Sequence, residues 1–206
     1  MSERPIIFSG SMVRAILDGR KSQTRRVVKR QPVGGDSCFA WNGGFAVGRL
    51  RDSENSVREL RCPYGVPGDR LWVRETFARV TQRIGSSDKP FAYRADLAPG
   101  EVFAGVGRWT PAIHMPRLAS RLTLEVTGVR VERVQEISAK DILAEGAVVR
   151  ACDDQFGHNP VSAFDGRVYL DLKSLWAAGW NSINGKRAPW ESNPWVWVVE
   201  FRRLKP

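Results

Sequence analysis

Lys21 and Thr24 have the residue types and the spacing of a base and its nucleophile. They lie three residues apart in the segment Gly19–Arg26, which reads GRKSQTRR. A lysine that has lost its proton can take the proton of a threonine hydroxyl, and the hydroxyl oxygen then attacks a carbonyl carbon. Residues three apart in a regular strand point to opposite faces, so we expect a turn after Gly19 to bring the two side chains together.

Glu145 is the best candidate for a third, proton-transferring group. It lies near the end of the segment Ser138–Gly146, which reads SAKDILAEG and predicts a short helix. Ser138 and Asp141 fit a capping box, and Gly146 fits the left-handed position after a helix. The helix dipole disfavours a charged carboxylate at this end, which suits an acid that must give up a proton. The alternative is an ordinary surface glutamate.

A run of positive charge surrounds Lys21. The residues from Arg20 to Arg30 include six basic side chains and no acidic one. We expect this charge to lower the pKa of Lys21 by repulsion, and to hold a phosphate or a polynucleotide backbone. The alternative is a solvated basic turn. Across the chain, the candidate residues for binding substrate or nucleic acid are Arg20, Ser22, Arg25, Arg26, Trp72, Arg74, Lys186 and Arg187.

The composition of the whole chain is basic and favours a nucleic acid or nucleotide partner. The 206 residues include 32 Lys and Arg against 22 Asp and Glu, which gives a net charge of +10, and there are 8 Trp. Of the 32 basic residues 25 are Arg, whose planar guanidinium suits phosphates and base edges and stacks on aromatic rings. A genome rich in Arg codons and a core rich in Trp would give the same composition.

Several classes of protein are excluded on composition and motifs. With 42% hydrophobic residues the chain can form a core, yet no apolar run approaches the roughly 18 residues that span a bilayer. No secretory signal is visible at the N-terminus. Three Cys without a CxxC pair, and two His without ligand spacing, argue against a disulfide framework and a metal site. We therefore expect a cytoplasmic protein without a membrane segment, metal or cofactor, and the oligomeric state stays open.

The apolar patterning predicts several strands with three short helices between them. Strands are expected at 6–8, 23–28, 71–78, 91–94, 109–115, 121–134 and 195–201, and helices at 9–19, 138–146 and 168–183. Asn42-Gly43-Gly44 predicts a hairpin between 38–41 and 45–50, and Gly128 predicts a bulge or bend in the longest strand. This is an α+β pattern, interpreted as a small mixed barrel with helices at its ends.

In this order the motifs resemble the ASCH superfamily, whose members are small β-barrels related in fold to PUA domains. The motifs are GRKSQT at 19–24, PGDRLWV at 67–73, LEVTGV at 124–129, ISAKDILAEG at 137–146 and WVWVVEF at 195–201. The longer segments CPYGVPGDRLWVRETF and WNSINGKR are similar to those of ASCH proteins from phages and prophages. The resemblance implies a single ASCH-like domain over residues 1–206, with insertions at 29–61 and 80–108.

The resemblance also implies an activity. Bacterial members include an amidohydrolase that removes the acetyl group of N4-acetylcytidine with a Lys, a Thr three residues later and a Glu at a helix end. By motif these positions fall on Lys21 as base, Thr24 as nucleophile and Glu145 as the acid for the leaving amine. The alternatives are a module that binds RNA or single-stranded nucleic acid through phosphate contacts and Trp stacking, and a metal-independent ribonuclease.

Overall fold

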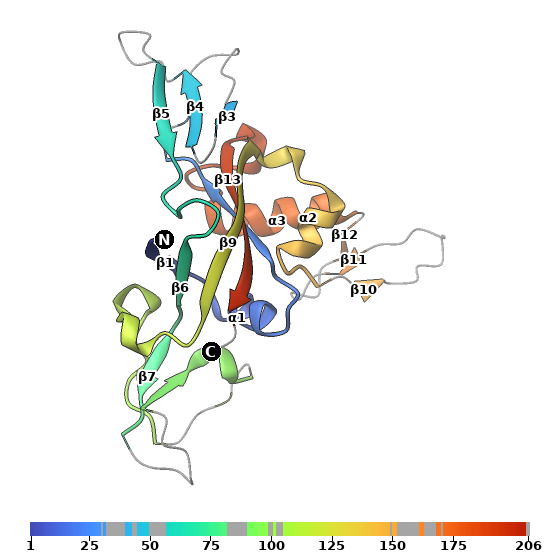
Figure 1. The fold of residues 1–206 in the computed structure, drawn as a ribbon. Coiled ribbons are helices and arrows are strands. Elements are labelled where there is room, and N and C mark those ends of the chain that lie inside the picture. The colour runs from blue at the N-terminus through green and yellow to red at the C-terminus, as the bar shows by residue number, and fades with distance from the viewer. Residues whose placement is uncertain are drawn as a thin grey trace.

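The chain folds as an α+β protein, as its pattern predicts. A computed structural model describes residues 1–29, 31, 40–42, 45–49, 57–81, 90–98, 101, 105–148, 150–151, 161–162, 168–169 and 171–204. Within these ranges the strands form one sheet of five strands and three smaller sheets, with three α-helices beside them (Figure 1).

The five-stranded sheet is the centre of the fold. Its strands, in spatial order, are β1 (Glu3–Ile7), β6 (Arg70–Arg74), β9 (Thr123–Arg133), β13 (Trp195–Leu204) and β2 (Gln23–Val27). β1 runs parallel to β6, and the other neighbours are antiparallel. Local periodicity does not reveal the parallel pair, because its two strands are far apart in the sequence.

Each α-helix begins at a side chain that caps its first backbone N–H groups. The helices are α1 (Gly10–Leu17), α2 (Ala139–Ala144) and α3 (Leu172–Asn184). Their caps are Ser9, Ser138 and Asp171, which accept hydrogen bonds from the backbone N–H three residues further on. Among the described residues, none of the helices has the length and apolar character needed to cross a membrane.

The two faces of the central sheet carry separate apolar clusters. Alternate side chains of a strand point to opposite faces, and β13 follows this rule. Trp197 and Val199 lie in the main core cluster with residues of α1, whereas Val196 and Val198 pack with Trp180 of α3. α2 contacts α3 (Figure 1). We call the face that carries Val196 and Val198 the second face of the sheet. Because α3 covers this face and α2 contacts α3, polar side chains of α2 can reach it.

The edge strands β1 and β2 approach each other around the main core. The Arg26 guanidinium of β2 donates a hydrogen bond to the Ile7 carbonyl of β1 at 2.6 Å. Phe8, which follows β1, packs on Phe201 of β13 with ring centroids 6.0 Å apart. The sheet is therefore strongly curved. In the described residues a side chain, rather than a backbone ladder, joins its two edges.

Eight short strands form the smaller sheets. They are β3 (Ala40–Asn42), β4 (Phe45–Arg49) and β5 (Val57–Arg61); β7 (Phe77–Arg79) and β8 (Phe91–Tyr93); and β10 (Arg150–Ala151), β11 (Val161–Ser162) and β12 (Val168–Tyr169). The antiparallel pairing of β3 with β4 confirms the predicted hairpin strands, while the Gly43-Gly44 turn lies outside the described residues.

Several predicted elements differ from the structure. The strand expected at 109–115 is instead a 3-10 turn at Ala112–His114, because Pro111 and Pro116 on either side lack the N–H that a ladder needs. The strand expected at 71–78 breaks into β6 and β7, and the helix expected from residue 168 begins only after Asp171. The bulge is confirmed, since Gly128 pairs with Glu200 and Val126 with Phe201, leaving an extra residue between them.

Candidate active site

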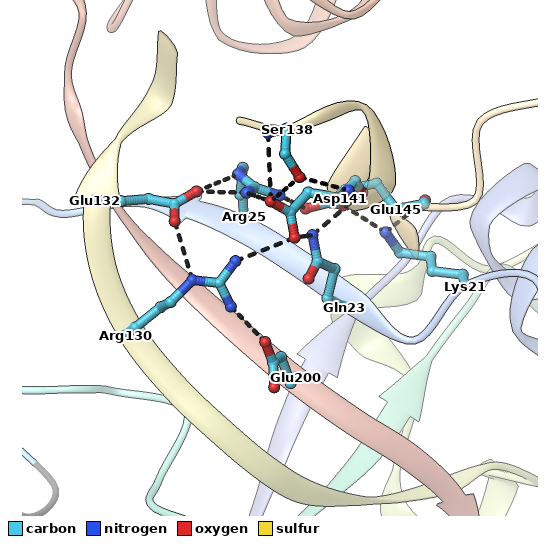
Figure 2. Close-up of polar contacts among 9 residues, drawn as sticks. All are labelled: Lys21, Gln23, Arg25, Arg130, Glu132, Ser138, Asp141, Glu145 and Glu200. Atoms are coloured by element: carbon cyan, nitrogen blue, oxygen red, sulfur yellow. Dashed lines mark hydrogen bonds and ion pairs between the residues drawn. The ribbon is translucent and has the colours of Figure 1, made fainter. Parts of the chain in front are cut away.

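Lys21 and Glu145 form a buried ion pair. The Lys21 ammonium donates hydrogen bonds to Glu145 Oε2 at 2.7 Å and to the Glu145 backbone carbonyl at 2.8 Å. The two side chains are 0% and 3% exposed. They come from segments more than 120 residues apart, and the close-up in Figure 2 shows them meeting at the end of α2. Two candidates that the sequence analysis selected from separate segments are therefore in contact.

The turn after α1 fixes the backbone at Lys21. Gly19 has φ +74°, a left-handed conformation that ends the helix. The N–H groups of Arg20 and Lys21 then both donate to the Ala15 carbonyl, at 2.9 and 3.0 Å. The Ser22 N–H donates to the Ala144 carbonyl at 2.8 Å, which ties this turn to the end of α2. The catalytic candidate is thus held by main-chain contacts to two helices.

Glu145 is placed by the ends of the short helix α2. The predicted capping box is present: Ser138 accepts from the Asp141 N–H, and Asp141 accepts from the Ser138 N–H. Glu145 is the residue that ends the helix, and its N–H donates to the Asp141 carbonyl. Gly146 follows at φ +87°. The capped N-terminus of α2 and the turn at Gly146 therefore fix the backbone position from which the Glu145 side chain extends.

Gly146 is needed for close packing as well as for its backbone conformation. A Cβ added at this position would lie 2.8 Å from the Ala15 Cβ and 3.0 Å from the Lys21 Cβ. We expect Gly146→Ala to lower the free energy of unfolding by more than the roughly 1–2 kcal/mol that a positive φ alone costs, measured by urea denaturation. Gly19→Ala is the matched control, because Gly19 shares the positive φ but has no atom within 4 Å of the added Cβ. Equal losses in the two variants would show that the packing at Gly146 is unimportant.

Burial lowers the pKa of Lys21 below its usual value, and the interaction with Glu145 works in the opposite direction. Repulsion from Arg26 and Arg25 adds smaller lowering effects. The sequence prediction of a lowered pKa is thus confirmed in direction, but its main cause is burial rather than the neighbouring arginines. The Lys21 ammonium also lies 5.7 Å from the centre of the Phe8 ring.

Thr24 lies on β2, the edge strand that follows Lys21. Its side chain is buried, at 2% residue exposure. It pairs across the ladder with Val199, a residue of the main core cluster, so its hydroxyl lies on the same sheet face as that cluster. Arg25 pairs with Val198 and lies on the opposite face. Lys21 precedes the strand, and its ammonium lies near the Phe8 ring and bonds to Glu145. Within the described residues, no hydrogen bond joins the Thr24 hydroxyl to Lys21 or Glu145.

A network of ion pairs continues from Glu145 across the second face of the sheet (Figure 2). Arg25 contacts Glu145 Oε1 at 3.3 Å, Asp141 at 3.4 Å, and Glu132. Arg130 in turn contacts Glu132 at 3.0 Å and Asp141 at 3.2 Å. Burial alone would raise the pKa of Asp141, but hydrogen bonds from Ser138 and Gln23, with the charge of Arg25, lower it to about 2.

The other residues expected to bind substrate near Lys21 are engaged with the protein or face solvent. The side chain of Arg25 is 0% exposed and its guanidinium is surrounded by carboxylates, so this geometry does not suit a phosphate ligand. Arg26 bonds to the Ile7 carbonyl and lies over the Phe8 ring. Arg20 pairs with Asp18 and also donates to the Gly146 carbonyl, and Ser22 is exposed.

The more distant candidates lie on other elements. Trp72 and Arg74 are on β6, on the side of the sheet opposite to the buried Leu71 and Val73, and the Arg74 guanidinium lies 5.4 Å from the Trp72 ring centre. Lys186 and Arg187 are exposed in the turn after α3. In the part of the chain that the structure describes, no hydrogen bond or ion pair joins these four residues to the Lys21–Glu145 pair.

Sequence analysis missed most of the network beyond Glu145. Glu132, Arg130, Gln23 and Glu200 were not singled out, and Asp141 was predicted only as a helix cap. Two signals were available in the strands: Gln23 with Arg25, and Arg130 with Glu132, are two residues apart and therefore share one face. Polar pairs at that spacing within apolar strands indicate a buried ionic cluster, although they do not identify its partners.

The described ranges contain no group of three or more His, Cys, Asp or Glu side chains arranged to hold a metal ion. Comparisons of this chain with protein-family models, curated proteins and solved structures found no match. The function must therefore be argued from the geometry of the site.

Proposed function

We propose that this chain is an amidohydrolase that removes the acyl group of N4-acetylcytidine or a related N-acylated nucleoside. The observation that carries the proposal is the 2.7 Å contact between the buried side chains of Lys21 and Glu145. A base and an acid in contact can exchange a proton, and Thr24 supplies a hydroxyl three residues from the base. The resemblance of the ordered motifs to the ASCH superfamily suggests the substrate class.

The acylation step begins when the shared proton moves from Lys21 to Glu145 along their hydrogen bond. The neutral Lys21 amine takes the Thr24 hydroxyl proton as the Thr24 oxygen attacks the amide carbonyl carbon. The C–N bond then breaks, and Glu145 protonates the leaving amino group of cytosine. The products are cytidine, an acetyl ester on Thr24, and the regenerated ion pair of Lys21 and Glu145.

Deacylation uses the same groups in reverse. A water molecule attacks the ester carbonyl while the Glu145 carboxylate takes its proton, and the Thr24 oxygen leaves with the proton of Lys21. The product leaves as acetic acid, which ionises to acetate in solution; the proton on Glu145 returns to Lys21, and Thr24 is free for another cycle. Burial of Lys21 supports this scheme, because a lowered pKa makes the neutral amine accessible at lower pH than for a lysine in water.

We also propose that the fold is of the PUA-like ASCH type. The curvature of the central sheet around the main core supports this, as does the hydrogen bond from Arg26 to the Ile7 carbonyl that links its two edges. A single domain over residues 1–206, with insertions at 29–61 and 80–108, remains part of the proposal. Within those insertions, the residues outside the described ranges are 30, 32–39, 43–44, 50–56, 82–89, 99–100 and 102–104.

The direct test is incubation of the purified chain with N4-acetylcytidine, followed by chromatography of cytidine and measurement of acetate. We expect equal amounts of the two products. A parallel reaction with N4-benzoylcytidine tests whether the site accepts an acyl group larger than acetyl. If neither substrate is cleaved between pH 6 and 10, the proposal is wrong.

Binding of RNA or single-stranded nucleic acid is a second candidate function. The net charge of +10 favours it, as does Trp72, whose ring centre lies 5.4 and 6.0 Å from the guanidinium groups of Arg74 and Arg117. A gel-shift titration over a salt series tests it, since phosphate contacts make affinity fall steeply with salt. A ribonuclease is less favoured, because a carboxylate beside Lys21 repels a phosphate.

A further inference from the structure

The charged side chains around Glu145 form a connected series of ion pairs in which positive and negative groups alternate. Lys21 and Arg25 both contact Glu145, but at different oxygens: Lys21 at Oε2 and Arg25 at Oε1, 3.3 Å away. Beyond Arg25 come Glu132 and Asp141, each of which also contacts Arg130 (Figure 2). Arg130 finally pairs with Glu200. This series of ion pairs extends from the buried Lys21 to side chains at the surface.

We propose that Arg25 is a positioning residue that holds Glu145 through Oε1, so that Oε2 faces Lys21, and that Glu132 and Asp141 set how strongly Arg25 acts. The inference rests on the proposed function, because it assigns Arg25 a part in the same reaction. Arg25 suits this part because its planar guanidinium reaches three carboxylates at once and its side chain is fully buried.

The arrangement controls the proton that Lys21 and Glu145 share. A positive charge near Oε1 stabilises the carboxylate and opposes transfer of the proton from Lys21 to Glu145. The acidic partners of Arg25 reduce that effect, because their charges offset part of its field at Glu145. The balance between Arg25 and its partners therefore sets the pH range over which the pair holds the single proton that the reaction needs.

The charged groups that face the pair come from several elements. From β2 and the turn before it there are Arg25, Arg26 and the exposed Arg20. Asp141 of α2 and Glu132 of β9 connect to the pair through Arg25. Arg130 of β9 contacts these two carboxylates, and Glu200 of β13 contacts Arg130. Arg25 is the one of these, in the described residues, whose guanidinium contacts the Glu145 side chain directly.

The test compares pH–rate profiles of two variants with opposite changes of charge. Arg25→Gln removes a positive charge, so we expect both limbs of the profile to move to higher pH by about one unit or more. Glu132→Gln removes a partner of Arg25, so we expect both limbs to move to lower pH. Arg25→Lys keeps the charge, and its limbs should return toward the wild-type positions. A merely structural role for Arg25 would lower the rate without moving the limbs, and would overturn the proposal.

Matched controls come from the ion pair between the exposed Arg202 and the partly exposed Glu125. Arg202→Gln changes the net charge by the same amount as Arg25→Gln, and Glu125→Gln by the same amount as Glu132→Gln. The limbs of the pH–rate profiles of both controls should stay at the wild-type positions. If Arg25→Gln does not fold, the shift of Glu132→Gln alone decides the outcome.

A readout without turnover separates this proposal from the proposed function. NMR titration of the Glu145 carboxyl carbon and the Lys21 side-chain nitrogen follows the shared proton directly, with Glu145→Gln and Lys21→Met used for assignment. If the wild-type chain cleaves no substrate but the titrations still shift in opposite directions in the two variants, the proposed function fails while the role of Arg25 stands. Unshifted titrations overturn the role of Arg25 even if substrate is cleaved.

Discussion

The Thr24→Val variant is expected to cleave N4-acetylcytidine about a thousand-fold more slowly than the wild-type chain, or worse, while keeping its fold. Valine has nearly the same shape and the same preference for strands, and it removes only the hydroxyl. The Thr24 side chain lies on the face of β2 that carries the main core cluster, so a methyl group is easily accommodated there. The measurements are initial rates with saturating substrate and the urea midpoint of both proteins.

Thr123→Val is the control for this substitution. Thr123 also lies in the central sheet, on β9, and its hydroxyl accepts a hydrogen bond from the exposed Arg117. We expect this variant to retain wild-type turnover. A Thr24→Val protein that remains within about ten-fold of wild type would exclude Thr24 as the nucleophile, because loss of a nucleophile costs far more than that.

The second large effect is expected from Glu145→Gln, which should lower the free energy of unfolding by about 3 to 5 kcal/mol. The amide keeps the size of the side chain but leaves Lys21 and part of Arg25 buried without a counter-charge. Lys21 then has only neutral hydrogen-bond acceptors, which are the backbone carbonyl of residue 145 and the amide oxygen of the substituted side chain. Urea denaturation at pH 7 measures the loss.

The loss of unfolding free energy in Glu145→Gln should be smaller at high pH than at pH 7. Burial already lowers the pKa of Lys21 in the folded state, and removing Glu145 takes away the interaction that opposes this shift. The unfolded chain then binds more protons than the folded chain between the lowered pKa and the usual value of 10.5, so stability rises with pH across that window. We expect Glu145→Gln to gain more stability than wild type between pH 7 and pH 9.5.

A double variant separates the charge effect from packing. Lys21→Met with Glu145→Leu replaces both charges by apolar side chains of similar volume, and buried pairs replaced in this way often lose little stability. We expect this protein to be more stable than Glu145→Gln alone. If it is less stable, hydrogen bonding and shape, not the unpaired charge, dominate at this site.

The local parts of the site were predictable because they depend on neighbouring residues. The capping box of Ser138 and Asp141, the end of α2 at Glu145 and the left-handed Gly146 follow from short-range backbone chemistry, and the structure confirms all three. The same holds for the bulge at Gly128. The strand expected at 109–115 was wrong because apolar composition was weighed above the two prolines that flank Ala112–His114.

The wider network depends on contacts that no local pattern encodes. Arg25 was expected to bind substrate because it lies in a basic run, residues 20–30, which contains no acidic side chain. In space it lies among Glu132, Asp141 and Glu145, which are more than 100 residues away along the chain. The fold therefore surrounds Arg25 with carboxylates that neutralise its charge. We interpret Arg25 as a partner of these carboxylates and not as a ligand for phosphate.

The sequence by itself determined the mixed α+β class, the helix caps and turns, and the identity of Lys21 and Glu145 as candidates. These follow from local propensity and side-chain chemistry, which act over a few residues. Tertiary structure alone decided that Lys21 and Glu145 lie in contact, and that burial rather than repulsion lowers the pKa of Lys21. The physical reason is that desolvation and ion pairing depend on what surrounds a group in space, and only the tertiary fold brings α1, α2 and Phe8 together around Lys21.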